Sequence, residues 1–308
     1  MRIPKILHFV WIGPNQPSEL HMECLQSWKR IHRAYEIKFW TNHDLTIEKF
    51  PFTFAYFYKS KSFAECKDIL VLEILLNYGG YYIDMDVYCL QHLNNFVDPS
   101  TTFLVCNETN QVWQRNYDEE PAHQKGKPIP CTNAFIGTIS GDVLFMDAII
   151  ELKSKNWGAW TPTNELTGPW SFGRLVEKKI KQPGFQVFTP RTLYEILWNH
   201  EPSTTLKWAK QIEERDASID KAIVPLSISF TKKQILGMHL WAQTWRFSFL
   251  NIARSTLEFY NHEDTQGVST LTNRSDLYRD ENVKHDEKET LVDSHVAIII
   301  PFRHDPTN

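Results

Sequence analysis

The sequence lacks the features that mark several common classes of protein. Its five cysteines are odd in number and scattered, and none forms a CxxC pair, which argues against a disulfide framework or a zinc site. No stretch reaches the ~18 apolar residues that a membrane-spanning helix needs, and the apolar N-terminal stretch ends without a small-residue cleavage site. Basic residues are not in excess, because the net charge is −4, whereas a general nucleic-acid binder would usually be basic. We therefore expect a cytoplasmic protein with reduced cysteines, no membrane span and no nucleic-acid partner.

What the sequence does contain is enough apolar material for a large core. Of its 308 residues 42% are hydrophobic, and eleven are tryptophans, whose side chains suit surfaces that are partly apolar and partly wet. The composition becomes polar and charged from 261 to 294, and an apolar run follows. We expect one folded domain over 1–260 and a polar linker over 261–294. Residues 295–308 would form either the first strand of a truncated second domain or a strand that returns to the main sheet.

Strand and helix patterns alternate along the first part of the chain. A β-rich segment over 3–12 ends at Gly-Pro, Ser18 can cap a helix with apolar residues at helical spacing, and alternating apolar residues predict a strand over 35–41. A further strand is expected over 133–139, a helix over 142–155, and another helix from Pro169. This alternation predicts an α/β fold whose sheet is largely parallel.

One helix in this series stands out because it is apolar nearly all round. A capping-box pattern at 62–65 opens it, and Gly79-Gly80 ends it. A helix that is apolar on every side is buried, and a strand is expected to follow at once over 81–87.

The strand expected over 81–87 carries two carboxylates. Residues two apart in a strand face the same side, so Asp84 and Asp86 would project together with Tyr82, ~7 Å apart in Cα spacing. Carboxylates this close repel each other, and oxygen ligands suit Mg²⁺ or Mn²⁺. The alternative is a pair of solvated acids, but the expected position at the carboxyl end of an α/β strand favours a ligand site.

Asp68 is a second candidate, because it lies on the apolar helix. A buried carboxylate needs a hydrogen-bonding or charged partner. It would either accept hydrogen bonds from the hydroxyl groups of a ligand or satisfy a loop of the protein itself.

These residues together resemble the DXD-containing sugar-transferase family, the family-32-like glycosyltransferases. That family includes yeast-type initiating mannosyltransferases and bacterial capsule enzymes and is related to the catalytic domains of the large clostridial glucosylating toxins. The Gly-Gly-x-Tyr-x-Asp-x-Asp core is its specific motif. The matching segments are IPKILHFVWIG at 3–13, AECKDILVLEILLNYGGYYIDMDV at 64–87, NAFIG at 133–137, LTGP at 166–169 and HLWAQTW at 239–245.

The resemblance implies a GT-A fold, in which a Rossmann-like sheet flanked by helices binds the nucleotide-sugar, and a retaining sugar transfer. It implies that Trp11 stacks on the nucleotide base, Asp68 binds donor-sugar hydroxyls, and Asp84 contacts ribose and sugar. Asp86 would hold the metal, and His239 would complete the metal shell or contact the diphosphate. The partners would be a nucleotide-sugar donor, with UDP-sugars first and GDP-mannose second, and an acceptor that is a glycan, a lipid-linked sugar or a protein hydroxyl.

Five further residues complete the expected donor site. Thr167 and Gly168 would offer free backbone amides at a helix N-terminus, which attracts anions. Asn133 would face the donor sugar, and Trp241, with Trp245, would close over it. Each of these residues also has a purely structural interpretation, as a helix start, a backbone partner or a core side chain.

One departure from the family motif bears on activity. The family usually reads Ser-Asp-x-x-Arg before Gly-Gly, whereas this chain has Lys67-Asp68 and Val71. Either another cation, Lys67 included, substitutes for the arginine, or donor binding is altered. A degenerate nucleotide-sugar- or carbohydrate-binding module is therefore the alternative to an enzyme.

A phosphatase of the aspartyl-nucleophile kind is disfavoured, because Val87-Tyr88 follow Asp86 where DxDxT would be expected.

The C-terminal segment VAIIIPFR at 296–303 resembles the start of β-1,4-galactosyltransferase-type domains. This resemblance implies a second transferase domain in the natural protein.

Overall fold

The computed structural model of the chain describes residues 2–107 except 58 and 61, 131–193 except 158–160 and 162, 200–214, and 235–242. The expected linker over 261–294, the terminal strand over 295–308 and Trp245 lie outside these residues.

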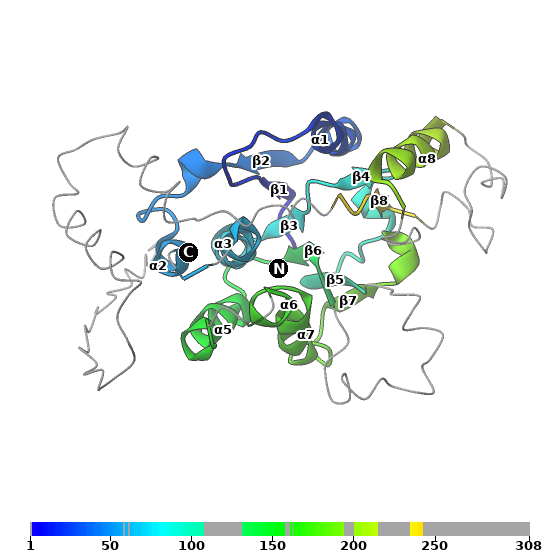
Figure 1. Cartoon of the computed structure of the whole chain (residues 1–308). Helices are drawn as coiled ribbons and strands as arrows, with labels where there is room; N and C mark the ends of the chain where they lie inside the picture. Colours follow the sequence, from blue (N-terminus) through cyan, green and yellow to red (C-terminus); the bar gives the residue numbers. More distant parts are fainter. Residues whose placement is uncertain are drawn as a thin grey trace, which may run out of the picture. The chain divides into compact units, whose positions relative to one another are not determined.

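A six-stranded sheet forms the centre of the molecule, with strand order β2-β1-β3-β6-β5-β7 (Figure 1). Five strands run in one direction and β6 opposes them, so the expected largely parallel sheet is confirmed with one reversed strand. The strands are β1 Ile6–Val10, β2 Glu36–Trp40, β3 Gly80–Ile83, β5 Phe103–Asn107, β6 Cys131–Thr138 and β7 Phe185–Phe188.

Helices cover both faces of this sheet, and the expected α/β fold is confirmed. Figure 1 shows α1 on one side of the sheet and α5, α6 and α7 on the other. The α-helices are α1 Glu19–Ile31, α2 Pro51–Phe57, α3 Phe63–Tyr78, α5 Val143–Glu151, α6 Thr163–Leu166, α7 Pro169–Glu177 and α8 Pro202–Glu214. The described residues also form the 3₁₀ turns η1 Asn42–Asp44, η2 Leu93–Asn95, η3 Leu152–Ser154 and η4 Pro190–Thr192.

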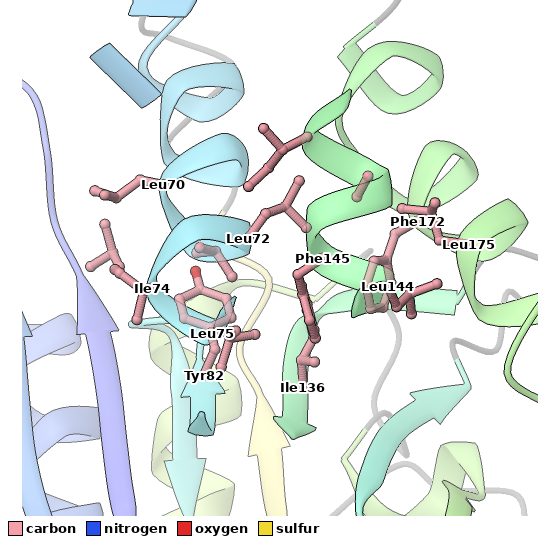
Figure 2. Close-up of a cluster of buried hydrophobic side chains, with 14 of the residues drawn as sticks. Leu70, Leu72, Ile74, Leu75, Tyr82, Ile136, Leu144, Phe145, Phe172 and Leu175 are labelled. Carbon is pink, nitrogen blue, oxygen red and sulfur yellow. The ribbon is translucent and has the colours of Figure 1, made fainter. Parts of the chain in front are cut away.

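Two hydrophobic clusters fill the two sides of the sheet. On one side Leu75 of α3, Phe145 of α5 and Phe172 of α7 pack with Tyr82 and Ile136 of the sheet, as Figure 2 shows. On the other side the cluster contains Trp28 of α1 and the alternate β3 residues Tyr81 and Ile83. Strand β3 therefore has no solvent-facing side, which is typical of a central strand in an α/β sheet.

Helix α3 forms as the sequence predicted. The hydroxyl of Ser62 accepts a hydrogen bond from the Glu65 N–H at 3.2 Å, which is the first half of the expected capping box. The Glu65 carboxylate accepts from the Thr163 hydroxyl at 2.9 Å and so connects α3 to α6. The helix ends at Gly79, whose N–H donates to the Leu75 carbonyl. Because α3 packs between the sheet and other helices, its sequence is apolar on nearly every side.

The single strand expected over 81–87 is wrong. Strand β3 ends at Ile83, and the chain turns between Asp84 and Val87, where the Val87 N–H donates to the Asp84 carbonyl at 3.1 Å. A separate strand, β4 Val87–Cys89, then pairs with β8 Gly237–His239 in a two-stranded antiparallel sheet. Residues far apart in the sequence therefore meet beside this turn.

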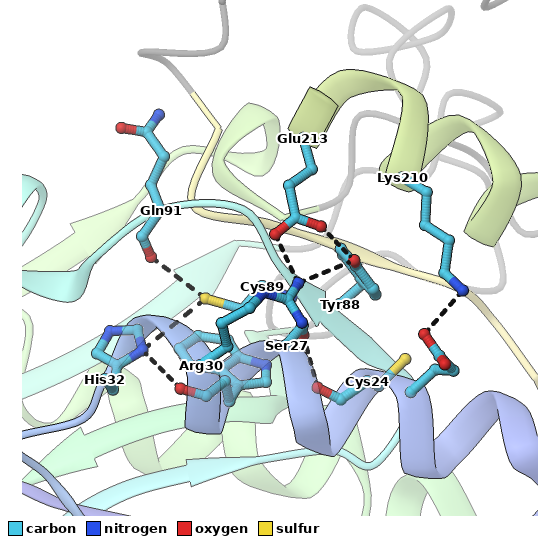
Figure 3. A network of polar contacts seen from close by, with 11 residues as sticks. Cys24, Ser27, Arg30, His32, Tyr88, Cys89, Gln91, Lys210 and Glu213 are labelled. Atoms are coloured by element: carbon cyan, nitrogen blue, oxygen red, sulfur yellow. Dashed lines mark hydrogen bonds and ion pairs between the residues drawn. The ribbon is translucent and has the colours of Figure 1, made fainter. Parts of the chain in front are cut away.

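Polar contacts hold α8 against α1 and β4. Arg30 of α1 forms an ion pair with Glu213 of α8 at 2.5 Å, and the Tyr88 hydroxyl of β4 donates to the same carboxylate (Figure 3). Lys210 of α8 also pairs with Glu23 of α1 at 2.7 Å. These contacts hold α8 next to α1 and to β4, the strand that pairs with β8.

The cysteines at positions 24, 66, 89 and 106 are buried, as expected. None of the helices in the described part of the chain combines the length and the apolar character that crossing a bilayer would require.

Candidate metal and donor site

The turn between β3 and β4 brings the two motif carboxylates together with a distant histidine. Asp84 and Asp86 lie in this turn, and the β4–β8 register places His239 opposite Val87. One carboxylate oxygen from each aspartate and one ring nitrogen of His239 all lie within 4.8 Å of one another. The two carboxylates therefore converge, although they do so through a turn and not by sharing one face of a strand.

Backbone contacts from the end of β8 hold Asp86. Its carbonyl accepts from the Leu240 N–H at 2.8 Å, and its Oδ2 accepts from the Ala242 N–H at 2.9 Å. Its Oδ1 lies 3.5 Å from Nε2 of His239. The Oδ2 of Asp86 thus binds the backbone that follows β8, and its Oδ1 faces the imidazole of His239.

His239 and Trp241 lie side by side next to Asp86. The Nδ1 of His239 accepts from the Trp241 N–H at 3.2 Å, and the two rings meet edge to face with centroids 4.4 Å apart. Trp241 has φ +56°, a left-handed conformation that is uncommon for residues other than glycine. Such strain persists only where the surroundings fix it, and it is concentrated at functional sites.

Asp84 is held by two donors. The Tyr82 hydroxyl and the Lys67 ammonium both donate to its Oδ1, the latter at 3.1 Å. Burial by itself would raise the pKa of Asp84, but the Lys67 charge and the Tyr82 hydroxyl outweigh it and the net shift is downward. The carboxylate therefore stays ionised in a partly buried position, as a metal or donor ligand must.

Asp68 has the partners that its burial requires. Its Oδ1 accepts from Asn133 at 2.9 Å and lies 3.3 Å from the Lys67 ammonium, while its Oδ2 accepts from the Thr167 hydroxyl at 2.9 Å. Burial raises the pKa of Asp68, and Lys67 and Thr167 oppose that shift. Three of the predicted donor-site residues, Asp68, Asn133 and Thr167, therefore meet in one network.

The expectation of free amides at Thr167 and Gly168 is wrong. Both N–H groups donate to the Thr163 carbonyl, at 3.0 and 2.9 Å, because they close the last turn of the short helix α6. Gly168 is the N-cap of α7, and Pro169 at the first position has no N–H. Thr167 instead contributes its hydroxyl, through Asp68.

Trp11 lies at the carboxyl end of β1 and is half-buried. Its indole N–H donates to the Asn15 carbonyl at 2.7 Å, and its ring centroid is 4.6 Å from that of His21. The neighbouring Gly13 is fixed through both backbone groups by the side chain of Asn42. The indole is therefore held in one orientation, which a stacking surface needs.

His21 is a site neighbour that sequence reasoning missed. It lies on α1, is 4% exposed, and its Nδ1 shares a hydrogen bond of 2.7 Å with the Ser18 hydroxyl. Burial lowers the pKa of His21, and the charges of Asp86 and Asp84 oppose this shift. In the sequence it is only a histidine in the first turn of a helix, and no spacing connects it to the later turn.

The position of the family arginine is part of the core in this chain. Val71 is 3% exposed and belongs to the cluster of α3, α5 and α7 side chains. A cation does lie next to the site carboxylates, namely Lys67. It stands at the serine position of the Ser-Asp-x-x-Arg motif, whereas Val71 stands at the arginine position.

The chemistry of this cluster fits a divalent cation. Carboxylate oxygens are the ligands that Mg²⁺ and Mn²⁺ prefer, and a histidine can supply a further ligand atom. Asp84, Asp86 and His239 offer such atoms within 4.8 Å of one another, and the Asp86 Oδ1 that faces the cluster lies 3.5 Å from the imidazole.

Comparisons with known proteins agree with this geometry. The sequence model of the family "Glycosyltransferase sugar-binding region containing DXD motif" matches residues 18–104. Inositol phosphoceramide mannosyltransferase 2 of Schizosaccharomyces pombe is 27% identical over an alignment of 186 residues, which covers 58% of this chain and 48% of that protein. The chain thus matches about half the length of that relative.

Two solved structures share part of the architecture. The PaToxG glycosyltransferase has a TM-score of 0.44 and 18% identity over 58% of this chain and 70% of its own. The UDP-bound glycosyltransferase domain of the YGT toxin has a TM-score of 0.41 and 10% identity over 72% of this chain and 88% of its own.

The similarity to a viral protein is the clearest evidence for the family of this chain. "Uncharacterized glycosyltransferase L373" of Acanthamoeba polyphaga mimivirus is 33% identical over an alignment of 201 residues, which covers 59% of this chain and 73% of that protein. Because the family match also contains Asp84 and Asp86, the chain belongs to the DXD-containing glycosyltransferase family.

Proposed function

We propose that the chain is a retaining glycosyltransferase that moves a sugar from a nucleotide-sugar to a hydroxyl acceptor. One observation carries the proposal: Asp84, Asp86 and His239 converge beside the buried Asp68 network, at the carboxyl ends of β1 and β3. That end of an α/β sheet is where ligands bind.

Asp86 and His239, with Asp84, would hold a divalent ion, with Mn²⁺ first and Mg²⁺ second. A bound ion would stabilise the negative charge that develops on the leaving diphosphate. Asp84 and Asp68 would position the ribose and the sugar hydroxyls, and Trp11 would stack on the base.

The reaction breaks the bond between the anomeric carbon and the phosphate oxygen and forms one to the acceptor oxygen. In a retaining transfer both events take place on one face of the sugar, and the acceptor proton passes to a phosphate oxygen. This route needs no protein base. A double displacement would need a carboxylate nucleophile beside the anomeric carbon.

UDP-sugars are the first choice of donor and GDP-mannose the second. The fission-yeast relative is named a mannosyltransferase, which favours mannose as the transferred sugar. The acceptor would be a glycan, a lipid-linked sugar or a protein hydroxyl.

Substitution of Asp86 tests the proposal. Asp86→Asn keeps an oxygen for the Ala242 N–H but loses the charge, and Asp86→Ala loses both. We expect both variants to lose Mn²⁺-dependent hydrolysis of the preferred donor, found in a panel of UDP-sugars and GDP-mannose, by about 100-fold or more. Circular dichroism should show an unchanged fold.

Asp98→Ala is the matched control, because Asp98 is an exposed acid that caps Ser100. Its donor hydrolysis should equal that of the unsubstituted chain. Hydrolysis that persists in Asp86→Asn would overturn the site assignment. A chain that binds nucleotide-sugar but turns over no donor would be the degenerate binding module, for which the buried Val71 is the supporting observation.

A further inference from the structure

Lys67 occupies an unusual position between the two carboxylates of the donor site. Its ammonium lies 3.3 Å from Asp68 and 3.1 Å from Asp84, and 5.6 Å from the centroid of the Tyr82 ring. Its side chain is 23% exposed, so the ammonium is largely withdrawn from bulk water but not sealed into the core. Asp68 comes from α3 and Asp84 from the β3–β4 turn, so one ammonium joins two separate elements.

The charge balance of the site depends on this ammonium. Asp68, Asp84 and Asp86 contribute three negative charges, and Lys67 reduces the total to two. One divalent cation would then neutralise the site. Without Lys67 the metal-loaded site would keep a net negative charge toward an incoming diphosphate, which is itself an anion. At these short distances charges interact strongly, because little water lies between them.

The same ammonium also limits how tightly the metal can bind. It donates to Oδ1 of Asp84, a carboxylate of the candidate metal cluster, and its positive charge repels a cation. Lys67 should therefore weaken metal binding and strengthen diphosphate binding.

We propose that Lys67 is a positioning residue that balances the charge of this site. Its ammonium holds Asp68 and Asp84 together, strengthens the binding of a diphosphate and weakens the binding of the metal ion alone. This inference rests on the proposed function. Lys67 would then have the cationic role that an arginine at the position of Val71 could have served.

The test substitutes Lys67 and measures two affinities in the full chain. Lys67→Gln removes the charge but keeps an N–H donor, and Lys67→Arg keeps the charge. The two probes are Mn²⁺ alone and UDP at saturating Mn²⁺, both measured by isothermal titration calorimetry. GDP replaces UDP if the unsubstituted chain prefers it.

We expect opposite shifts in Lys67→Gln. Its Mn²⁺ affinity should rise about five- to tenfold, and its affinity for the nucleoside diphosphate should fall about tenfold, as loss of one close charge predicts. Lys67→Arg should stay within about threefold of the unsubstituted chain for both probes. A purely structural role for Lys67 would weaken both affinities together, so the opposite signs identify charge balance.

Lys179→Met is the matched control. Lys179 forms a buried ion pair of 2.7 Å with Asp142, beyond the other end of β6 from Asn133. Both affinities should be unchanged in this variant. Equal affinities in Lys67→Gln and the unsubstituted chain, or a fall in both, would overturn the inference. If the unsubstituted chain binds neither Mn²⁺ nor nucleoside diphosphate, the proposed function itself fails.

Discussion

A nucleotide base needs a flat, partly apolar surface of fixed orientation, and Trp11 offers one. Its indole is anchored by the hydrogen bond to the Asn15 carbonyl and lies against His21. We expect Trp11→Ala to weaken nucleotide binding by about 1–3 kcal/mol, the range for stacking of a base on an aromatic side chain. Equilibrium titration with UDP and GDP in the presence of Mn²⁺ measures the loss.

Trp11→Phe is the control for that experiment, since it keeps an aromatic face but loses the bond to Asn15 and one of the two rings. It should retain most of the affinity. An unchanged affinity for both nucleotides in Trp11→Ala would remove this side chain from the donor site.

At the residue scale, the sequence predicts that the two carboxylates converge, but it does not predict how they do so. Asp84 and Asp86 do converge, but a turn brings them together, because the chain leaves the central sheet after Ile83. The resemblance nominated His239, which the local sequence could not distinguish from a core histidine. Lys67 was named only as one substitute cation, and its contacts with two carboxylates depend on the packing of α3 against the turn.

At the scale of elements, the junction between α3 and β3 depends on the glycine at position 80. Gly80 has φ +93°, and a Cβ there would lie 2.7 Å from the Ile6 carbonyl oxygen and 3.0 Å from Nε2 of His8. The helix can therefore lead directly into a central strand only if this position has no side chain.

We expect Gly80→Ala to destabilise the protein by more than 2 kcal/mol, since the substitution adds steric overlap to ~1–2 kcal/mol of left-handed backbone strain. Urea unfolding measures the change. Gly141→Ala is the matched control, because Gly141 also has a positive φ, +73°, but nothing lies within 4 Å of the position of a Cβ. It should cost only the strain. Equal losses in the two variants would show that crowding at Gly80 does not matter.

Elements with strong local signals were predictable, and those stabilised by distant partners were not. Helix α3 has its cap at Ser62 and its glycine stop in the sequence, and the structure forms it between them. Strand β4 is only Val87–Cys89, and its partner β8 comes from residues 237–239. A three-residue strand has no periodicity to recognise, and its pairing is set by tertiary contact.

At the scale of the whole molecule, two buried histidines connect parts of the fold in their neutral form. His8 donates from Nε2 to the Gly79 carbonyl at 2.7 Å and accepts at Nδ1 from the Trp40 indole at 3.0 Å. His32 accepts at Nε2 from the Leu93 N–H at 2.9 Å and lies beside Cys89 in the network of Figure 3. Each uses one ring nitrogen as an acceptor, so protonation would break a buried hydrogen bond.

Burial is the main reason that the pKa of each histidine is lowered to about 4, from about 6.5 in the unfolded chain. Above pH 6.5 both states bind no proton at these groups, and the stability is at its full value. As the pH falls from 6.5 toward 4 the unfolded chain takes up protons that the folded chain does not. The free energy of unfolding should therefore fall by about 1.4 kcal/mol per pH unit for each histidine, or about 3 kcal/mol each by pH 4.

Urea unfolding of the full chain between pH 7.5 and about 5.5 measures this dependence, above the range in which most carboxylates titrate. In His8→Gln the side-chain amide can still donate to the Gly79 carbonyl but cannot titrate. This variant should be less stable than the unsubstituted chain at pH 7.5, and its slope below pH 6.5 should be smaller by about 1.4 kcal/mol per pH unit. An unchanged slope would mean that His8 is protonated equally in the folded and unfolded states, and would contradict its burial as a neutral link between Trp40 and Gly79.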